Sequence, residues 1–276
     1  MSVGGVLSEN KKVSLKVTDK VAWVEIDNER NRNAMTLQMW RQLRECIQQA
    51  EDHADVNVIA ITGAGDKAFI SGADISEFAT LRDSEEQVKE YGQAVEAAQN
   101  AIAHSSKPTV ALINGLCIGG GIGVALACDL RYSSMETKFR MPAARLGLGY
   151  DLHGLARAVD VMGYANTADI FLSARVFDGT EAQRLGLVNL SFAAEHFDKE
   201  ARSMIQEIAH HAPLSLRSVK LSLRYLLQRS QGAFADQQAL TNEQVEKAVQ
   251  QCFDSQDYRE GQLAFKEKRT PNFVGR

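Results

Sequence analysis

The stretch Thr109-Val-Ala-Leu-Ile-Asn-Gly-Leu-Cys-Ile-Gly-Gly-Gly-Ile-Gly-Val-Ala-Leu-Ala-Cys-Asp129 decides the fold of this chain. An apolar, β-branched run is followed by three consecutive glycines that begin at Gly119, and then by a helix of small residues. Glycine has no Cβ, so this junction between a strand and a helix lets the backbone approach another group closely. The first N–H groups of the helix have no intrahelical acceptor and lie at the positive end of its dipole. The pattern therefore predicts a site for an anion or for a developing oxyanion.

The overall composition is that of a globular enzyme. The chain has 276 residues, of which 45% are hydrophobic and 24% are charged, and both values are ordinary for a globular domain. A formal net charge of -4 argues against a nucleic-acid partner, because such a surface carries a basic excess. No apolar run reaches the roughly 18 residues of a membrane helix, and the N-terminus lacks the pattern of a signal peptide. We therefore expect no membrane association and no cleaved leader.

The cysteines and histidines show no spacing that is typical of metal ligands. The four cysteines include no C-x-x-C pair, and the six histidines include no H-E-x-x-H motif. Free cysteines in apolar surroundings behave as small hydrophobic residues. We expect no metal site and no disulfide, and hence a reducing compartment, the cytoplasm.

Local patterns predict strands and helices in an order typical of an α/β protein. Strands are expected at residues 13–17, 21–26, 56–62, 68–70, 130–133 and 138–141. Thr36 is placed to cap the helix that follows it, and a polar helix is expected over about residues 84–104. Asp129 ends the glycine helix, where it needs a partner such as Arg131.

The last part of the chain is helical in pattern. A helix is expected to begin near Gly154, with a break at Val161–Tyr164, and a long amphipathic helix begins at Pro213. No linker rich in proline or serine divides the chain. We therefore predict one structural unit, with a core over residues 1–195 and a C-terminal helical region over residues 196–276.

Five motifs follow one another along the chain. They are Asn33-Ala-Met, Phe69-Ile-Ser-Gly-Ala-Asp-Ile75, the run from Lys107-Pro-Thr through Gly119-Gly-Gly to Cys128-Asp129, Ala182-Gln-Arg-Leu-Gly-Leu-Val188, and Phe265-Lys-Glu-Lys-Arg-Thr-Pro-Asn-Phe273. Together they resemble the motifs of the crotonase (enoyl-CoA hydratase/isomerase) family. The resemblance implies an α/β fold, a spiral of ββα units with a C-terminal helical trimerisation layer. It also implies a homotrimer or a dimer of trimers.

The resemblance implies an enzyme that processes acyl-CoA thioesters. It requires no cofactor, because coenzyme A is part of the substrate. The family binds the thioester carbonyl with two backbone N–H groups, at positions that match Ala73 and Gly120. Preorganised donors of this kind stabilise the oxygen charge that develops in the transition state.

Three basic residues match positions that border coenzyme A in the family. Arg30 and Arg32 lie on the early loop, and Lys268 lies in the closing motif, which the family often brings to the site of a neighbouring subunit. Arginine suits phosphate recognition. The alternative is that these side chains are ordinary solvated surface charges.

The chain departs from the hydratases of the family at both of their catalytic glutamates. The pattern G-G-G-x-E has Gly123 in place of the glutamate, and the pattern x-P-E has Ala143. Neither residue can carry a proton, although hydration needs a positioned base and acid. Ordinary two-glutamate hydration is therefore not expected.

Asp151 offers a substitute carboxylate. It lies eight residues after Ala143, at an offset where the dienoyl-CoA isomerases of the family carry a proton-transfer base and the aryl-CoA dehalogenases a nucleophile. A single carboxylate would move a proton between carbons or attack an aromatic carbon; alternatively, Asp151 only caps the next helix. Tyr150 is a candidate for lining the acyl pocket, and His153 is either a second acid/base or an exposed residue.

The sequence thus favours double-bond isomerisation, or another single-carboxylate reaction, through a thioester enolate. The alternatives are a hydratase-like lyase, a thioester hydrolase or a decarboxylase with atypical residues, and a subunit that binds acyl-CoA without catalysis. A dinucleotide-binding oxidoreductase is disfavoured, because the glycines do not have the spacing G-x-G-x-x-G.

Overall fold

The computed structural model describes residues 12–74, 77, 84–231 and 239–276. Its strands form two sheets, and neighbours in the larger sheet are parallel except for the first pair. The six-stranded sheet contains, in spatial order, β1 Lys12–Thr18, β2 Val21–Asp27, β3 Val58–Gly63, β5 Thr109–Ile113, β7 Leu130–Ser134 and β10 Leu190–Phe192. The four-stranded sheet contains β4 Ala68–Ile70, β6 Leu116–Ile118, β8 Lys138–Arg140 and β9 Phe177–Asp178.

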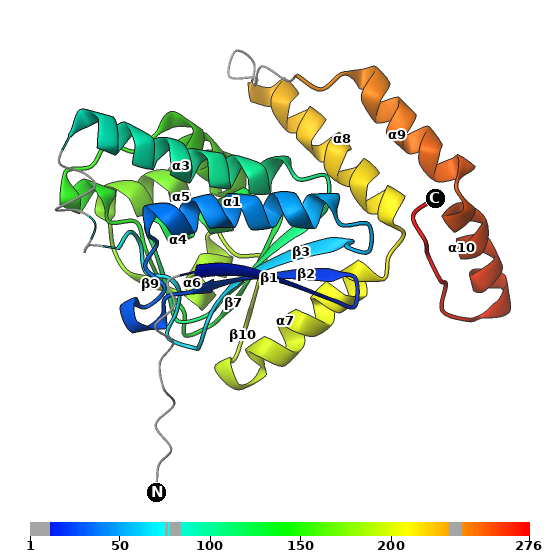
Figure 1. The fold of residues 1–276 in the computed structure, drawn as a ribbon, viewed down its shortest axis with the longest axis horizontal. Coiled ribbons are helices and arrows are strands. Elements are labelled where there is room, and N and C mark those ends of the chain that lie inside the picture. The colour runs from blue at the N-terminus through cyan, green and yellow to red at the C-terminus, as the bar shows by residue number, and fades with distance from the viewer. Residues whose placement is uncertain (1–11, 75–76, 78–83, 232–238) are drawn as a thin grey trace, which may run out of the picture.

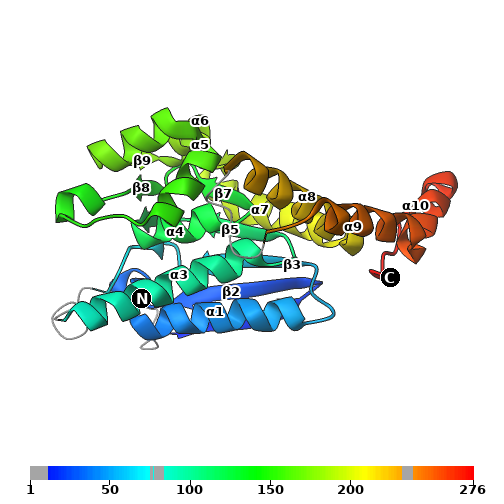
Figure 2. The same ribbon diagram turned by 90° about the horizontal axis from the view of Figure 1, so that it is seen from above.

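Helices cover both faces of the larger sheet and extend beyond it (Figures 1 and 2). The helices are α1 Leu37–Asp52, α3 Glu85–His104, α4 Gly120–Ala127, α5 Leu152–Ser173, α6 Gly179–Arg184, α7 Ala194–Ala209, α8 Pro213–Gln231, α9 Asn242–Asp254 and α10 Gln256–Glu267. Two 3-10 turns, η1 Glu29–Asn31 and η3 Ala143–Leu146, lie in the connecting loops. The α/β fold expected from the sequence is confirmed.

Local signals set the ends of several elements. Thr36 caps α1 by accepting a hydrogen bond from the Met39 N–H at 3.1 Å, and Ser84 caps α3 by accepting one from the Gln87 N–H at 3.2 Å. Helix α5 begins at Leu152 rather than near Gly154, because Asp151 caps it two residues earlier than expected. The expected break appears at Gly163, whose φ of 76° is not helical.

The core lies on both faces of the central strands. In β3 the alternating side chains of Ile59 and Ile61 join the cluster beneath α1, α3 and α4, while Val58 and Ala60 face the cluster beneath α7. Side chains of a strand point alternately to opposite faces, so a strand buried on both faces is apolar throughout. The central strand β3 is thereby held between two apolar clusters.

Helices α8, α9 and α10 form an arm that points away from the sheets (Figures 1 and 2). Lys220 of α8 anchors the arm, because its Nζ lies 2.6 Å from Asp129 Oδ2 and 2.8 Å from the carbonyl oxygen of Lys107. The expected pairing of Asp129 with Arg131 is wrong. Arg131 instead donates to the carbonyl oxygens of Ala125 and Cys128 at the carboxyl end of α4, and to that of Leu187 at 2.8 Å.

The arm carries large exposed apolar side chains. Phe265 is 88% exposed, and Leu223, Leu226 and Phe253 are also exposed. Such a surface is typical of an interface, and the trimer remains a prediction. Within the described residues, none of the helices has both the length and the apolar character needed to cross a membrane.

Candidate active site

An asparagine-rich loop holds the segment that contains Ala73. Asn33, with a φ of 57°, donates from Nδ2 to the carbonyl oxygens of Ala64 at 2.9 Å and Ala68 at 2.6 Å. Asp74 Oδ2 accepts from the side-chain amide of Asn31 at 3.3 Å. These bonds tie the loop before α1 to the segment around β4, both before and after that strand.

The N–H group of Ala73 takes no part in the β-bridge that Ala73 forms with Met35. Met35 donates from N to the Gly72 carbonyl oxygen at 2.8 Å, and the Asp74 N–H donates to the Met35 carbonyl oxygen at 2.9 Å. Met35 and Ala73 form a parallel bridge, in which the bonds of Met35 go to the residues on either side of Ala73. The N–H of Ala73 therefore points away from Met35.

The triple glycine brings α4 against its neighbours. Gly119 has a φ of 54°, which suits glycine, and a Cβ on Gly121 would lie 2.7 Å from the carbonyl oxygen of Ile70. Helix α4 begins at Gly120, so the N–H of Gly120 belongs to the first turn and has no intrahelical acceptor. The predicted reason for these glycines, close backbone approach at a helix N-terminus, is confirmed.

Ala73 and Gly120 line one cavity of about 630 Å³. Trp40 and Tyr91 form part of its wall and are fixed by a hydrogen-bond chain: Trp40 Nε1 donates to Tyr91 Oη at 2.9 Å, which donates to the Met35 carbonyl oxygen at 3.2 Å. The structure thus brings both predicted oxyanion positions to a cavity large enough for an acyl chain.

The two positions where the sequence predicts missing glutamates, Gly123 and Ala143, lie beside and in this cavity. Ala143 lines it, at the start of η3. Gly123 lies in the second turn of α4, where a Cβ would overlap Nε2 of Gln99 and lie 3.2 Å from Gln99 Cδ. The space beside Gly123 is therefore taken by the amide of a residue on α3.

Gln99 and Arg157 are site residues that sequence reasoning missed. Both line the cavity, and Arg157 Nη1 donates to Gln99 Oε1 at 3.2 Å. They are far apart in the sequence and belong to no local motif. The only signal for them is the absence of a side chain at Gly123, which implies that another residue fills the space.

Asp151 lines the same cavity and also caps α5. Its Oδ1 accepts a hydrogen bond from the Gly154 N–H at 2.7 Å. The helix cap predicted for Asp151 is confirmed, and the carboxylate also lies at the cavity; its catalytic role remains a prediction. The cap fixes one oxygen and leaves Oδ2 available for other contacts.

Tyr150 and His153 also line the cavity. Tyr150 packs edge-on against Phe171 with ring centroids 4.9 Å apart. Burial, with a smaller effect of Asp151, raises the pKa of Tyr150 to about 12, so its hydroxyl stays protonated near neutrality. His153 is mostly exposed, and its Nε2 lies 4.0 Å from Oε1 of Glu96 on α3.

The three residues predicted to bind coenzyme A do not line the cavity of their own chain. Arg30 and Arg32 are exposed on the loop around η1. Lys268 caps the carboxyl end of α10 with a φ of 55°, and α10 lies at the far end of the arm (Figure 1). A role for Lys268 therefore requires the site of another subunit, and all three roles remain predictions.

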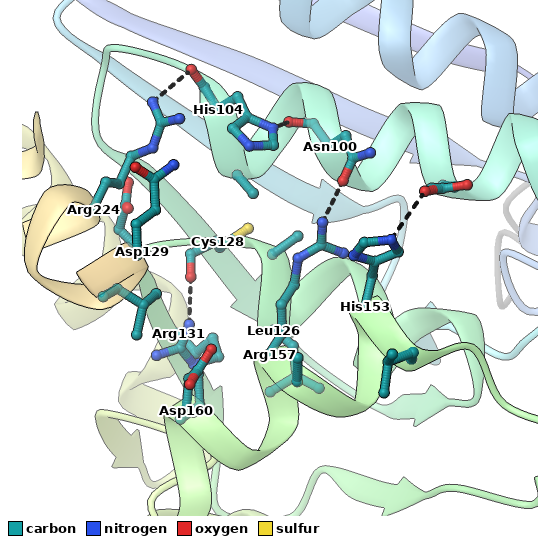
Figure 3. Close-up of a pocket in the computed structure, with 18 residues that line it drawn as sticks. Asn100, His104, Leu126, Cys128, Asp129, Arg131, His153, Arg157, Asp160 and Arg224 are labelled. Carbon is teal, nitrogen blue, oxygen red and sulfur yellow. Dashed lines mark hydrogen bonds and ion pairs between the residues drawn. The ribbon is translucent and has the colours of Figure 1, made fainter. Parts of the chain in front are cut away.

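A second cavity, of about 380 Å³, lies between α3, α5 and α8 (Figure 3). Its polar wall includes Glu96, His153 and Arg157, which also line the first cavity. Arg157 extends from α5 to Oδ1 of Asn100 on α3. Across the described residues, no group of three or more His, Cys, Asp or Glu is arranged to hold a metal ion.

Comparison with known proteins agrees with this architecture. The sequence model of a family described as "Enoyl-CoA hydratase/isomerase" matches residues 16–276. A crotonyl-CoA hydratase of Syntrophomonas wolfei is 29% identical over 268 residues, which are 96% of this chain and 98% of the relative. A peroxisomal Delta(3,5)-Delta(2,4)-dienoyl-CoA isomerase of Arabidopsis thaliana is 33% identical over 202 residues, covering 69% of this chain and 72% of the relative.

Solved structures show the same fold. The crystal structure of an enoyl-CoA hydratase/carnithine racemase from Magnetospirillum magneticum has a TM-score of 0.88 and 32% identity, and it covers 98% of this chain and 97% of that one. The chain belongs to the enoyl-CoA hydratase/isomerase family, and so to a class of enzymes that process acyl-CoA thioesters. The predicted family and fold are confirmed.

Proposed function

We propose that this protein isomerises a double bond in an acyl-CoA thioester with one carboxylate, that of Asp151. The observation that carries the proposal is the common cavity of Ala73, Gly120 and Asp151. Ala143, which lines this cavity, and Gly123, which packs against the lining residue Gln99, supply no acid. The pair of glutamates used by hydratases is absent, and one carboxylate is sufficient to move one proton.

The N–H groups of Ala73 and Gly120 are the oxyanion donors in this proposal. The first is turned away from its bridge partner and the second is at a helix N-terminus. Both are backbone groups held by the core, so they cost no reorganisation when charge develops on the thioester oxygen. Loss of one such donor lowers kcat by about 100- to 1,000-fold in comparable sites.

Proton transfer by Asp151 then completes the reaction. The carboxylate removes a proton from C2 of a 3-enoyl or 3,5-dienoyl thioester, and the electron pair moves onto the carbonyl oxygen. The protonated carboxyl returns the proton to the far carbon of the conjugated enolate, as the double bonds shift toward the thioester. No atom is gained or lost, so no co-substrate is needed.

The relatives support more than one outcome, because their names include hydratases as well as an isomerase. The test is a mass-spectrometric assay of the purified protein with crotonyl-CoA, 3-enoyl-CoA and 3,5-dienoyl-CoA in heavy water, beside Asp151→Asn. Deuterium incorporation or double-bond migration that disappears in Asp151→Asn supports the proposal.

Other results support the alternatives. Hydration, hydrolysis or decarboxylation that survives Asp151→Asn favours an atypical lyase or hydrolase. Binding of thioesters with no turnover and no label favours a non-catalytic acyl-CoA-binding subunit.

A further inference from the structure

Gln99 is a buried amide at the wall of the cavity, and the proposed chemistry does not use it. It lies on α3, is only 6% exposed, and occupies the space beside Gly123. A buried polar side chain normally has its hydrogen bonds satisfied. The partners of its two ends therefore indicate what the amide does.

The orientation of the Gln99 amide follows from Arg157. The guanidinium has only hydrogen-bond donors, so the atom 3.2 Å from Arg157 Nη1 must be the oxygen Oε1. The amide nitrogen Nε2 consequently faces the opposite way, toward Gly123 and the cavity. Arg157 is itself held to α3 by Asn100 (Figure 3), which fixes this arrangement.

The Nε2 group of Gln99 is a donor without a protein acceptor among the described residues. Its oxygen bond to Arg157 is the hydrogen bond that the structure gives to this side chain. Among the described residues, the side-chain polar atoms that are fully buried and have no hydrogen bond are Asp27 Oδ1, Ser133 Oγ and Thr167 Oγ1. Gln99 Nε2 also has no acceptor but is not one of these atoms, so it is not fully buried. The N–H groups of Nε2 therefore reach the open space of the cavity.

The surroundings of Gln99 add to the donor character of this wall. The Arg157 charge acts on Tyr150, where it opposes the effect of burial on that hydroxyl. Tyr150 remains protonated and supplies a further O–H group on the same cavity. An acyl chain that carries only hydrogen and carbon at this point would leave the Gln99 donors unpaired, which costs binding free energy.

We infer that Gln99 Nε2, oriented by Arg157, is a specificity-determining donor for an oxygen atom on the acyl chain. The substrate class is then a CoA thioester whose acyl group carries a hydroxyl, oxo or carboxylate oxygen. This inference rests on the proposed function, since it concerns the acyl group in the same cavity. A carboxylate would gain additionally from the charge of Arg157.

The experiment is a set of dissociation constants, measured by titration calorimetry with four-carbon thioesters that need not react. Butyryl-CoA is the apolar reference, and 3-hydroxybutyryl-CoA, acetoacetyl-CoA and succinyl-CoA carry the three kinds of oxygen. The wild-type protein is expected to bind at least one oxygenated thioester more tightly than butyryl-CoA. If only succinyl-CoA binds more tightly than butyryl-CoA, the subsite is specific for a carboxylate. If 3-hydroxybutyryl-CoA or acetoacetyl-CoA binds more tightly, the subsite is specific for a hydroxyl or an oxo group.

Gln99→Met tests the donor, because methionine keeps the length of the side chain and removes both N–H groups. Gln99→Met is expected to raise the dissociation constant of the preferred oxygenated thioester by roughly tenfold, which corresponds to the loss of about one buried hydrogen bond. The dissociation constant of butyryl-CoA is expected to stay unchanged. Gln48→Met is the matched control, since Gln48 is an exposed glutamine on α1 and does not line the cavity. It is expected to bind all four thioesters as the wild type does.

If Gln99→Met does not fold, Gln99→Glu provides a second test of the Nε2 donor. It keeps the shape of the amide and replaces the donor by an acceptor, so the preference for oxygenated thioesters is expected to disappear. Equal binding of all four thioesters by the wild type, or an equal loss for all four in Gln99→Met, would overturn the inference. If the wild type binds none of the four thioesters, the proposed function fails together with this inference. If it binds all four equally, only the inference about Gln99 fails.

Discussion

The carboxamide of Gln99 occupies the space beside the α-carbon of Gly123, where a Cβ would lie 3.2 Å from Gln99 Cδ and overlap Nε2. The resemblance to the family predicts that Gly123 takes the place of a hydratase glutamate. The space beside Gly123 is filled by the amide from α3, and that amide fits there because Gly123 has no side chain.

Gly123→Glu is expected to destabilise the protein rather than to create a hydratase. The new side chain would collide with Gln99 in a packed interior, where overpacking costs about 1–3 kcal/mol. The double variant Gly123→Glu with Gln99→Ala is expected to recover most of that stability, because the amide is removed. Thermal unfolding of the two variants measures the effect, and additive losses in the double variant would show that the residues do not compete for space.

Gly120→Pro tests the helix N-terminus as an oxyanion donor. Proline suits the first position of a helix and removes the N–H of Gly120, so kcat for the proposed isomerisation is expected to fall about 100- to 1,000-fold. The control is Gly120→Ala, which adds the same Cβ, 3.0 Å from Trp40 Cζ2, and keeps the N–H. Equal losses in both variants would assign the effect to crowding against Trp40.

Asp151→Ala and Asp151→Asn separate the helix cap from the chemistry. Alanine removes the oxygen that accepts from the Gly154 N–H, so a loss of about 1 kcal/mol in unfolding free energy is expected. Asparagine caps helices as well as aspartate does, so Asp151→Asn is expected to unfold near the wild-type temperature. Denaturant titration of both variants checks this, and equal destabilisation would mean that the charge of Asp151, not its cap, supports α5.

Stability above neutral pH is expected to depend on Lys107. Its Nζ donates to the carbonyl oxygens of Ala50 at 2.8 Å and His53 at 2.7 Å, and burial, with Arg217 nearby, lowers its pKa to about 8. An unfolded lysine titrates near 10.4. Between these two pH values, Lys107 binds more protons in the unfolded state than in the folded state. The contribution of Lys107 to the free energy of unfolding therefore rises with pH.

The measurement for Lys107 is the unfolding free energy of the wild type and Lys107→Met between about pH 7 and pH 10. The unfolding free energy of the wild type, relative to that of Lys107→Met, is expected to increase above about pH 8, near the pKa of Lys107. Lys199→Met, at an exposed position on α7, is the control and should show no such widening. A difference that stays constant would contradict the lowered pKa.

Much of the fold could be predicted because its signals are local. The caps at Thr36 and Ser84 and the glycine junction at Gly119 each depend on residues within one turn or loop. The apolar pattern predicts a start of α5 that is two residues late, because it is weaker evidence for a helix start than the cap of Asp151.

The rest of the site depends on contacts between distant elements. The Gln99–Arg157 bond joins α3 to α5, and the Lys220–Asp129 pair joins α8 to the end of α4. Sequence proximity predicts that Arg131 pairs with Asp129, but Arg131 donates to the carbonyls of Ala125 and Cys128 at the end of α4. Sequence proximity is a poor guide to such pairs because packing decides them.

The most direct test of the account is the turnover of 3-enoyl-CoA and 3,5-dienoyl-CoA by the wild type and Asp151→Asn. Both proteins would be assayed at the same concentration, after thermal unfolding has shown that they are equally folded. The account predicts double-bond migration by the wild type and a fall in kcat of about 100- to 10,000-fold in Asp151→Asn, the usual contribution of a general base. Migration at the wild-type rate in Asp151→Asn would contradict it and would leave Asp151 with the helix cap alone.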